Sequence, residues 1–395
     1  MSQQFPKVIL KKGKERSLLN FHPWLFSGAV EKADAGIKEG DIVEIYSNNQ
    51  NYLATGHYHE GSIKVRIFSF EKTGSEYEFW KEKIHRAYQL REKLGLTNNP
   101  ETNVYRLIHA EGDGLPGLII DIYNSTAVIQ AHTLGMHHKR NLFADALKEI
   151  YGSKLSAIYD KSSESLSKQE AIHVKNEFLF GETDGIQVLE NNVHFHVDIK
   201  EGQKTGFFID QRENRKLLSY YSKGKIILNA FSYSGGFSLY ALKEKAGLVH
   251  SVDSSKKAAE LTEQNIKLNF KEAPHQFYTE DVFDFLKKQE TSYDVIVVDP
   301  PAFAKHLSAV DKATIGYRNL NYEAIKRIKK NGILFTFSCS QVIDKALFRK
   351  IVFTAAAQAK RNVKILHQLT QPPDHPISIY HPEGEYLKGL VLYVE

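Results

Sequence analysis

Two side chains that could take part in covalent chemistry stand at the ends of two predicted strands. Cys339, the only cysteine among 395 residues, follows the apolar run from Ile333 to Ser338, and Asp299 ends the run that starts at Asp294. A thiolate is a strong nucleophile, and a carboxyl group can hold or transfer a proton. Open α/β sheets bind their ligands at the carboxyl ends of the strands, so we expect both residues to face one crevice.

A packing or capping role is the alternative for each of these residues. Free cysteine is among the most often buried residue types, and an aspartate after a strand often caps the next helix. Ser338 and Ser340 flank Cys339 in place of aliphatic residues, and two prolines follow Asp299. Placement alone leaves a chemical role and a packing or capping role open for each residue. The surrounding motifs are needed to distinguish between the two.

The elements that would position the two residues form an alternating pattern beyond residue 200. Helices separate predicted strands over Ile226–Asn229, Leu248–Asp253, Gln276–Thr279, Asp294–Asp299 and Ile333–Ser338. This alternation predicts an α/β fold with a doubly wound parallel sheet. We also expect a helix over Lys345–Ala359, a strand over Val363–Gln368 and a final antiparallel edge strand over Tyr386–Val394.

A glycine-containing turn follows the first of these strands. Its sequence, from Asn229 to Gly236, is Asn-Ala-Phe-Ser-Tyr-Ser-Gly-Gly, and a predicted helix begins at once. Glycine there lets a ligand approach the backbone at a helix N-terminus. The turn is neither the GxGxxG dinucleotide fingerprint nor a phosphate-cradling P-loop. The sequence therefore disfavours a nicotinamide dinucleotide or a nucleoside triphosphate as ligand.

Acidic residues end the strands that follow this turn. Asp253 suits the two hydroxyls of a ribose, Asp281 can address an adenine edge, and Asp299 ends the fourth strand. Each acid alone could be a helix cap, but the ordered set favours a nucleoside ligand that carries positive charge. S-adenosylmethionine fits, because the aromatic faces of Phe231 and Tyr233 can accept its sulfonium.

Two smaller domains are predicted before the parallel sheet. Residues 1–72 contain short β-rich runs over Lys7–Lys11, Asp41–Tyr46, Tyr52–Tyr58 and Ser62–Ser69, which predict a small barrel. A helix over Glu76–Leu94, strands from Val104 and over Leu118–Tyr123, a helix over His137–Tyr151, a strand over Ala157–Asp160 and a hairpin over Gly185–Ile199 predict a small α+β unit. We place the domains at 1–72, 73–185 and 186–395.

Composition indicates a soluble globular protein. The chain is 42% hydrophobic and 25% charged, with a formal net charge of +5, which permits a nucleic-acid partner without requiring one. One cysteine excludes an intramolecular disulfide. No apolar stretch has the length of a membrane span, and the first residues lack the order of a secretory signal. We expect a cytoplasmic protein with no membrane contact.

The motifs together resemble those of the bacterial 23S ribosomal RNA large subunit methyltransferase I family. The likeness rests on Asn229–Gly235, Val252-Asp253, Asp281, Asp299-Pro300-Pro301 and Phe337–Ser340, and on two longer strings, Phe21–Ala29 and Gly202–Arg212. It covers essentially the whole chain. The resemblance implies an N-terminal PUA-type RNA-binding β-barrel, a central small α+β domain and a Rossmann-like class I methyltransferase domain.

The resemblance also implies the reaction, which is methylation of cytosine at carbon 5 in 23S ribosomal RNA. Carbon 5 is a poor nucleophile until the Cys339 thiolate adds to carbon 6, and Asp299 would stabilise the charge that develops on the ring. We expect the sulfonium of the cofactor to lower the pKa of the thiol. Ala302-Phe303 stands where some RNA cytosine methyltransferases carry a second cysteine, so the base that removes the carbon 5 proton is not identified.

Further site residues follow from the motifs and the resemblance. The expected cofactor contacts are Gln203, Thr205, Phe208, Asn229, Phe231, Ser232, Tyr233, Ser234, Gly235, Asp253, Ser254, Asp281, Val282, Asp299 and Pro301. The expected RNA contacts are Lys11, Lys12, Lys14, Arg16, Lys64, Arg66, Lys204, Arg212 and Lys305. No metal site is expected, and a homodimer through the central domain is one prediction for the assembly.

Two other functions remain open at this point. In the first, the enzyme methylates an exocyclic amine of adenine or guanine in RNA, and Cys339 is a packing residue. In the second, the chain is a ribosome-assembly factor that holds S-adenosylmethionine without catalysis. Intact Asp299 and Cys339 argue against the second function.

Overall fold

The computed structural model describes residues 5–73, 76–167, 171, 174–304 and 306–395. The chain divides into two compact units. The first unit comprises Met1–Val188, Val197–Ile209 and Pro373–Gly384, and the second comprises Leu189–His196, Asp210–Pro372 and Glu385–Glu395. None of the helices in the described ranges is both long and apolar enough to cross a membrane.

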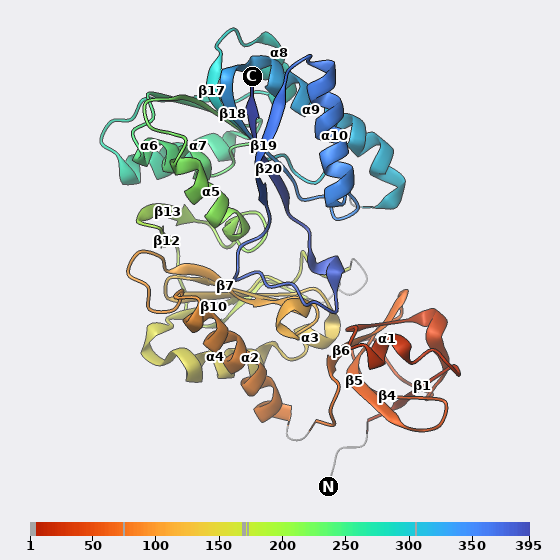
Figure 1. The fold of residues 1–395 in the computed structure, drawn as a ribbon. Helices are drawn as coiled ribbons and strands as arrows, with labels where there is room; N and C mark the ends of the chain where they lie inside the picture. Colours follow the sequence, from red (N-terminus) through yellow and green to blue (C-terminus); the bar gives the residue numbers. More distant parts are fainter. Residues whose placement is uncertain (1–4, 74–75, 168–170, 172–173, 305) are drawn as a thin grey trace. The chain divides into compact units, whose positions relative to one another are not determined.

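A six-stranded sheet begins the first unit (Figure 1, red to orange). Its order is β2-β6-β5-β4-β1-β3, and its strands are β1 (Lys7–Leu10), β2 (Trp24–Phe26), β3 (Val30–Ala33), β4 (Ile42–Tyr46), β5 (Tyr52–Tyr58) and β6 (Ile63–Ser69). A short helix, α1 (Arg16–Leu19), follows β1. Val8 and Leu10 alternate with less buried residues along β1 and join Val43, Ile45 and Val65 in one core. This period of two is what places one face of a sheet on a core.

A second sheet completes the first unit, in the order β11-β10-β9-β8-β7. The strands are β7 (Val104–His109), β8 (Leu118–Tyr123), β9 (Thr126–Ala131), β10 (Ala157–Asp160) and β11 (Glu177–Phe180), with helices α2 (Glu76–Lys93), α3 (Leu134–His137) and α4 (Arg140–Tyr151). Trp80 and Ile84 of α2 pack with Phe143 and Leu147 of α4 and with the sheet. Both helices lie on one face of it (Figure 1).

A hairpin follows, formed by β12 (Ile186–Glu190) and β13 (Val193–Val197), which pair in a two-stranded sheet of their own. Asn191 and Asn192 turn the chain with φ angles of 48° and 60°. Asparagine tolerates this left-handed region better than most residues, so both residues suit the turn of this hairpin. The structure confirms the hairpin predicted over Gly185–Ile199. In the second unit, Glu190 accepts two hydrogen bonds from Arg215, at 2.8 and 2.7 Å.

The second unit is built on a seven-stranded sheet in the order β16-β15-β14-β17-β18-β20-β19. The strands are β14 (Ile226–Ala230), β15 (Leu248–Val252), β16 (His275–Tyr278), β17 (Tyr293–Val298), β18 (Ile328–Ser338), β19 (Val363–Leu369) and β20 (Lys388–Val394). The five from β14 to β18 pair in parallel, as predicted. The strand order reverses direction at β14, between β15 and β17, and such switch points are where open sheets bind ligands.

The prediction that the last strand forms an edge of the sheet is wrong. β20 pairs antiparallel with β18 on one side and with β19 on the other, so β19 is the edge. The physical reason lies in burial. Six of the seven residues of β20 are buried, whereas Lys364, Ile365 and Leu366 of β19 are exposed to solvent.

Helices cover both faces of this sheet. They are α5 (Arg212–Ser219), α6 (Gly236–Lys243), α7 (Lys256–Asn269), α8 (Val282–Lys288), α9 (Val310–Arg327) and α10 (Lys345–Gln358). Along β17, Ile296 and Val298 pack in one core with α8, α9 and α10, while Val295 and Val297 pack in another with α5 and α6. A strand buried on both faces is apolar throughout, as in a parallel sheet.

Candidate active site

The loop after β14 has an unusual backbone. Phe231, Tyr233 and Gly235 have φ angles of 62°, 46° and 75°, within five residues. Non-glycine residues in this left-handed region are strained, and such strain clusters at functional sites. At Gly235, which caps α6, a Cβ atom would lie 2.7 Å from Cγ2 of Thr262. Only glycine fits there without displacing its neighbour.

Polar contacts hold this strained loop. Thr262 Oγ1 donates to the Tyr233 carbonyl oxygen at 2.9 Å, and Asn265 Nδ2 donates to the Ser234 carbonyl oxygen at 2.9 Å. Asp253, which directly follows β15, accepts a hydrogen bond from the Tyr233 amide at 3.1 Å. The structure therefore brings Asp253 together with the predicted cofactor turn.

Two buried polar atoms near this turn lack a protein partner among the described residues. They are Oδ1 of Asn229 and Oγ of Ser232, in side chains that are nearly inaccessible to solvent. Buried polar atoms almost always form hydrogen bonds, so these two indicate a polar ligand. Together with the Asp253 carboxylate at the same turn, they fit a nucleoside cofactor such as S-adenosylmethionine.

The other predicted cofactor residues of the second unit show no feature that by itself indicates a ligand. Asp281 caps α8, because its Oδ1 accepts a hydrogen bond from the Asp284 amide at 3.1 Å. Val282 is buried in the core, and Ser254 and Pro301 are exposed. For Asp281, the structure thus contains the helix-capping contact that the sequence left open as an alternative.

Three predicted cofactor residues belong to the first unit, whereas Asp253 and Asn229 belong to the second. Gln203 is exposed, and the ring of Phe208 lies 4.5 Å from Nζ of Lys204. Thr205 is buried and donates a hydrogen bond of 2.6 Å to Oδ2 of Asp121. Thr205 therefore has a clear role in fixing its own segment.

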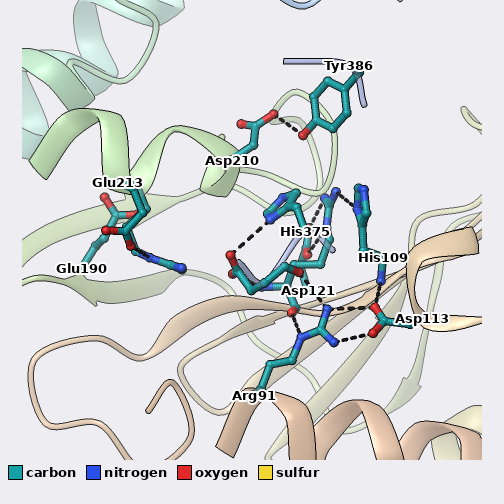
Figure 2. Close-up of polar contacts among 12 residues, drawn as sticks. Arg91, His109, Asp113, Asp121, Glu190, Asp210, Glu213, His375 and Tyr386 are labelled. Atoms are coloured by element: carbon teal, nitrogen blue, oxygen red, sulfur yellow. Dashed lines mark hydrogen bonds and ion pairs between the residues drawn. The ribbon is translucent and has the colours of Figure 1, made fainter. Parts of the chain in front are cut away.

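Asp121 belongs to a buried ion-pair cluster in the first unit (Figure 2). Its carboxylate accepts two hydrogen bonds of 2.8 Å from Arg106. Arg91 of α2 binds Asp113 through both Nη atoms and donates to the carbonyl oxygen of Asp374 at 2.7 Å. The cluster thus fastens the segment Pro373–Gly384 and the string around Thr205 to the central sheet. Its arginines carry no sequence signal that separates them from surface arginines.

Replacing Arg91 with methionine should destabilise the protein by about 3–5 kcal/mol, because Asp113 would keep a buried charge without its partner. Arg91 is fully buried. Arg86 offers a matched control on the same helix, since it is exposed and pairs with Glu82 at 2.7 Å. Arg86→Met should change stability by less than about 0.5 kcal/mol. Urea unfolding of both variants checks this, and equal midpoints would contradict the assigned role.

The predicted catalytic residues leave neighbouring strands. β17 and β18 pair in parallel, with Val298 opposite Thr336, so Asp299 and Cys339 follow the same edge of the sheet. The Sγ atom of Cys339 lies 3.8 Å from the carbonyl oxygen of Pro300 and donates to it. The thiol is partly accessible rather than enclosed in an apolar core. The structure therefore places this thiol beside the Asp-Pro-Pro turn.

A glutamine orients Asp299. Gln211 is buried and donates from Nε2 to Oδ2 of Asp299 at 3.0 Å, while its Oε1 accepts from Nδ2 of Asn214 at 2.6 Å. Next to it, Asp210 accepts a hydrogen bond of 2.7 Å from the Tyr386 hydroxyl (Figure 2). Gln211 was not predicted as a site residue, although it lies in the string Gly202–Arg212 that supports the family resemblance.

The predicted RNA contacts differ in accessibility. Lys11, Lys12, Lys14, Arg16 and Lys204 are exposed, and Lys64 is half-buried with Nζ 4.5 Å from the ring centre of Tyr58. Arg66 forms an ion pair of 2.9 Å with Glu111, and Arg212 is 2% exposed and pairs with Glu213. These pairs favour structural roles for both arginines. Lys305 lies outside the described residues.

Comparison with known proteins gives a consistent result. Residues 8–70 match the model of a PUA-like domain, and residues 164–389 match that of S-adenosylmethionine-dependent methyltransferases. The chain is 40% identical to ribosomal RNA large subunit methyltransferase I of Aeromonas salmonicida, covering 98% of each chain. It is 38% identical to the protein of the same name from Aliivibrio fischeri, covering 98% of this chain and 99% of the relative.

Solved structures agree with this fold. A SAM-dependent methyltransferase from Streptococcus mutans superposes with a TM-score of 0.83 at 23% identity, over 98% of this chain and all of the other. A methyltransferase complexed with SAH gives a TM-score of 0.84, also at 23% identity and with the same coverage. The predicted arrangement, with an N-terminal PUA-like domain and a Rossmann-like methyltransferase domain, is therefore confirmed.

Proposed function

The chain belongs to the ribosomal RNA large subunit methyltransferase I family, and we propose that it forms 5-methylcytosine in 23S ribosomal RNA through a covalent bond to Cys339. Membership makes it an S-adenosylmethionine-dependent methyltransferase of large-subunit ribosomal RNA. The observation that carries the finer proposal is the placement of the Cys339 thiol beside the Asp-Pro-Pro turn, one strand from Asp299.

The chemistry of cytosine explains why these two residues are needed. The Cys339 thiolate adds to carbon 6, forming a carbon–sulfur bond and giving carbon 5 the character of an enamine. The Asp299 carboxyl group stabilises the developing charge at ring nitrogen 3 through a hydrogen bond or a proton. S-adenosylmethionine, when bound, supplies an electrophilic methyl group. Loss of the carbon 5 proton then expels the thiolate and restores the aromatic ring.

The second unit supplies the residues that would hold the cofactor. The Asp253 carboxylate suits the ribose hydroxyls. Oδ1 of Asn229 and Oγ of Ser232, which have no partner within the described part of the chain, suit other polar groups of the cofactor. The cofactor can approach the backbone of the strained loop from Phe231 to Gly235 closely, because Gly235 has no side chain. Asp281 of this unit, and Gln203, Thr205 and Phe208 of the first unit, remain predicted cofactor contacts.

The target cytosine must leave a helical stack or lie in a single strand, because a stacked base hides the faces that react. The PUA-like domain, with its exposed Lys11, Lys12, Lys14 and Arg16, would bind the surrounding phosphates. Residues 1–72, 73–185 and 186–395 would then act as RNA-binding, central and catalytic domains. Binding through phosphates is independent of sequence and weakens with salt.

Nucleotide-resolved mass spectrometry of ribosomal RNA tests the proposal. In a strain that lacks the gene, we expect one methyl group to be missing from a cytosine of 23S ribosomal RNA. Wild-type protein should restore it, and the Cys339→Ala variant should not. Loss of a methyl group from an adenine or guanine amine would refute the proposed product while keeping the methyltransferase assignment. An unchanged modification pattern would refute 23S ribosomal RNA as the substrate.

A further inference from the structure

A buried lysine lies next to the proposed nucleophile. Lys388 begins β20, directly opposite Ser338 of β18, and is 3% exposed. Its Nζ atom donates to the carbonyl oxygens of Ser340 and Tyr386, both at 2.7 Å. Lysine is almost never fully buried without a partner that offsets the lost hydration. The reaction outlined above does not use this cation.

The two hydrogen bonds hold the ammonium group at the turn that carries Cys339. Ser340, the next residue, is fixed from two other directions as well. Its Oγ atom accepts from the Ala304 amide at 3.2 Å and shares a hydrogen bond of 2.8 Å with the hydroxyl of Tyr317. Residues of β20, α9 and the loop after the Asp-Pro-Pro turn therefore all hold Ser340, the residue next to Cys339.

The charged groups around Lys388 indicate that Cys339 is its electrostatic partner. Burial lowers the pKa of Lys388 to about 8, and this shift is opposed by the charges of Cys339, Glu385 and Asp344. Each carboxylate has another partner, since Glu385 pairs with Lys345 and Asp344 caps α10 through the Leu347 amide.

Among the described residues, other ionisable groups at this edge include the hydroxyl of Tyr317, which contacts Ser340, and the carboxylate of Asp299, which follows the neighbouring strand. Lys345 is a further cation, and it acts against the charge on Lys388. An attraction between two groups favours the charged form of both. The interaction that favours the ammonium form of Lys388 therefore also favours the thiolate form of Cys339.

We propose that Lys388 is a positioning residue that keeps Cys339 as a thiolate before the cofactor binds. This inference rests on the proposed nucleophilic role of Cys339. It differs from the expectation drawn from the sequence, in which the cofactor's sulfonium supplies the positive charge. In that case the thiol would have an ordinary pKa in the cofactor-free protein. A fixed lysine, by contrast, lowers the pKa of the thiol whether or not the cofactor is bound.

Alkylation kinetics of the single cysteine provide the test, because iodoacetamide modification at this thiol can be read by intact mass. We expect the rate-against-pH curve of cofactor-free wild-type protein to give a thiol pKa below the ordinary value of about 8.5. Lys388→Met removes the charge and keeps an unbranched side chain only one atom shorter. It should raise the thiol pKa and slow alkylation at pH 7 by about tenfold.

Two further variants control the experiment. Lys388→Arg retains a positive charge and should keep the thiol pKa below that of Lys388→Met. Lys345→Met removes an exposed lysine of the same region and should change the rate by less than about twofold. Binding of S-adenosylhomocysteine and thermal melting establish that each variant is folded. Because the wild-type curve is informative by itself, the test does not depend on the folding of Lys388→Met.

Either of two results would overturn the inference. One is a wild-type thiol pKa at or above about 8.5 without cofactor. The other is a folded Lys388→Met variant with an unchanged pKa. Failure of the proposed function would look different, since Cys339→Ala would then retain methylation whatever the alkylation rates are.

Discussion

Replacing Cys339 with alanine is expected to reduce methylation of 23S ribosomal RNA by at least about 10³-fold, a loss typical of removing a catalytic nucleophile. Without the thiolate, carbon 6 of cytosine gains no bond and carbon 5 stays unreactive. The affinity for S-adenosylmethionine should change by less than about threefold, because the Cys339 thiol acts on the cytosine and is not among the proposed cofactor contacts. Single-turnover methylation and calorimetric cofactor binding measure the two effects.

The Cys339→Ser variant is a matched control for the size of the side chain. It preserves a small polar side chain, but its hydroxyl is a far weaker nucleophile at neutral pH, so Cys339→Ser should be as inactive as Cys339→Ala. Substantial activity in either variant would show that Cys339 only packs against the Pro300 carbonyl. The enzyme would then be an amine methyltransferase, which is the alternative left open by the sequence.

Replacing Asp299 with asparagine should lower the rate of methylation by about 10²–10⁴-fold, the range expected for a lost acid–base group. Asparagine fills the same space and can still accept a hydrogen bond from Gln211, so the geometry of the turn should persist. It cannot supply the ionisable carboxyl group at ring nitrogen 3. The loss should therefore appear in the maximal rate more than in the affinity for RNA, as single-turnover kinetics with excess enzyme can measure.

Asp284→Asn is the control for this substitution. Asp284 is exposed in the first turn of α8, where charge removal should alter the methylation rate by less than about twofold. A comparable loss in both variants would indicate a general effect of charge or stability. An active Asp299→Asn enzyme would remove Asp299 from the proposed mechanism.

Local patterns in the sequence predicted most of the strands and helices. β5 and β8 have the predicted bounds, and α2 ends one residue earlier than expected. The short strands β2 and β3 were not predicted, because three or four residues are too few to show a period. The predicted edge position of β20 was wrong for another reason. Its pairing with β18 and β19 depends on contacts across the sheet, which an apolar run by itself does not specify.

The candidate site divides in the same way. The adjacency of Asp299 and Cys339 was predictable, because parallel strands of a doubly wound sheet end at one edge and both residues follow such strands. Gln211 and Lys388 were not predictable. Their segments lie far from Asp299 and Cys339 in the sequence, and neither residue type suggests a role without the fold that buries it.

The measurement that tests the central claim most directly is a search for the covalent adduct itself. Ribosomal RNA transcribed with 5-fluorocytidine offers the enzyme a ring whose carbon 5 carries fluorine in place of the proton. After methyl transfer that fluorine cannot leave as a proton does, so the carbon–sulfur bond should persist. Incubation with S-adenosylmethionine should then give a protein–RNA complex that survives denaturation.

Nuclease and protease digestion of that complex should leave a fluorinated, methylated pyrimidine on the peptide that contains Cys339, the only cysteine of the chain. The adduct should be absent without S-adenosylmethionine and absent in the Cys339→Ala variant. The account would be contradicted if the enzyme methylates ordinary RNA but forms no such adduct with the fluorinated RNA.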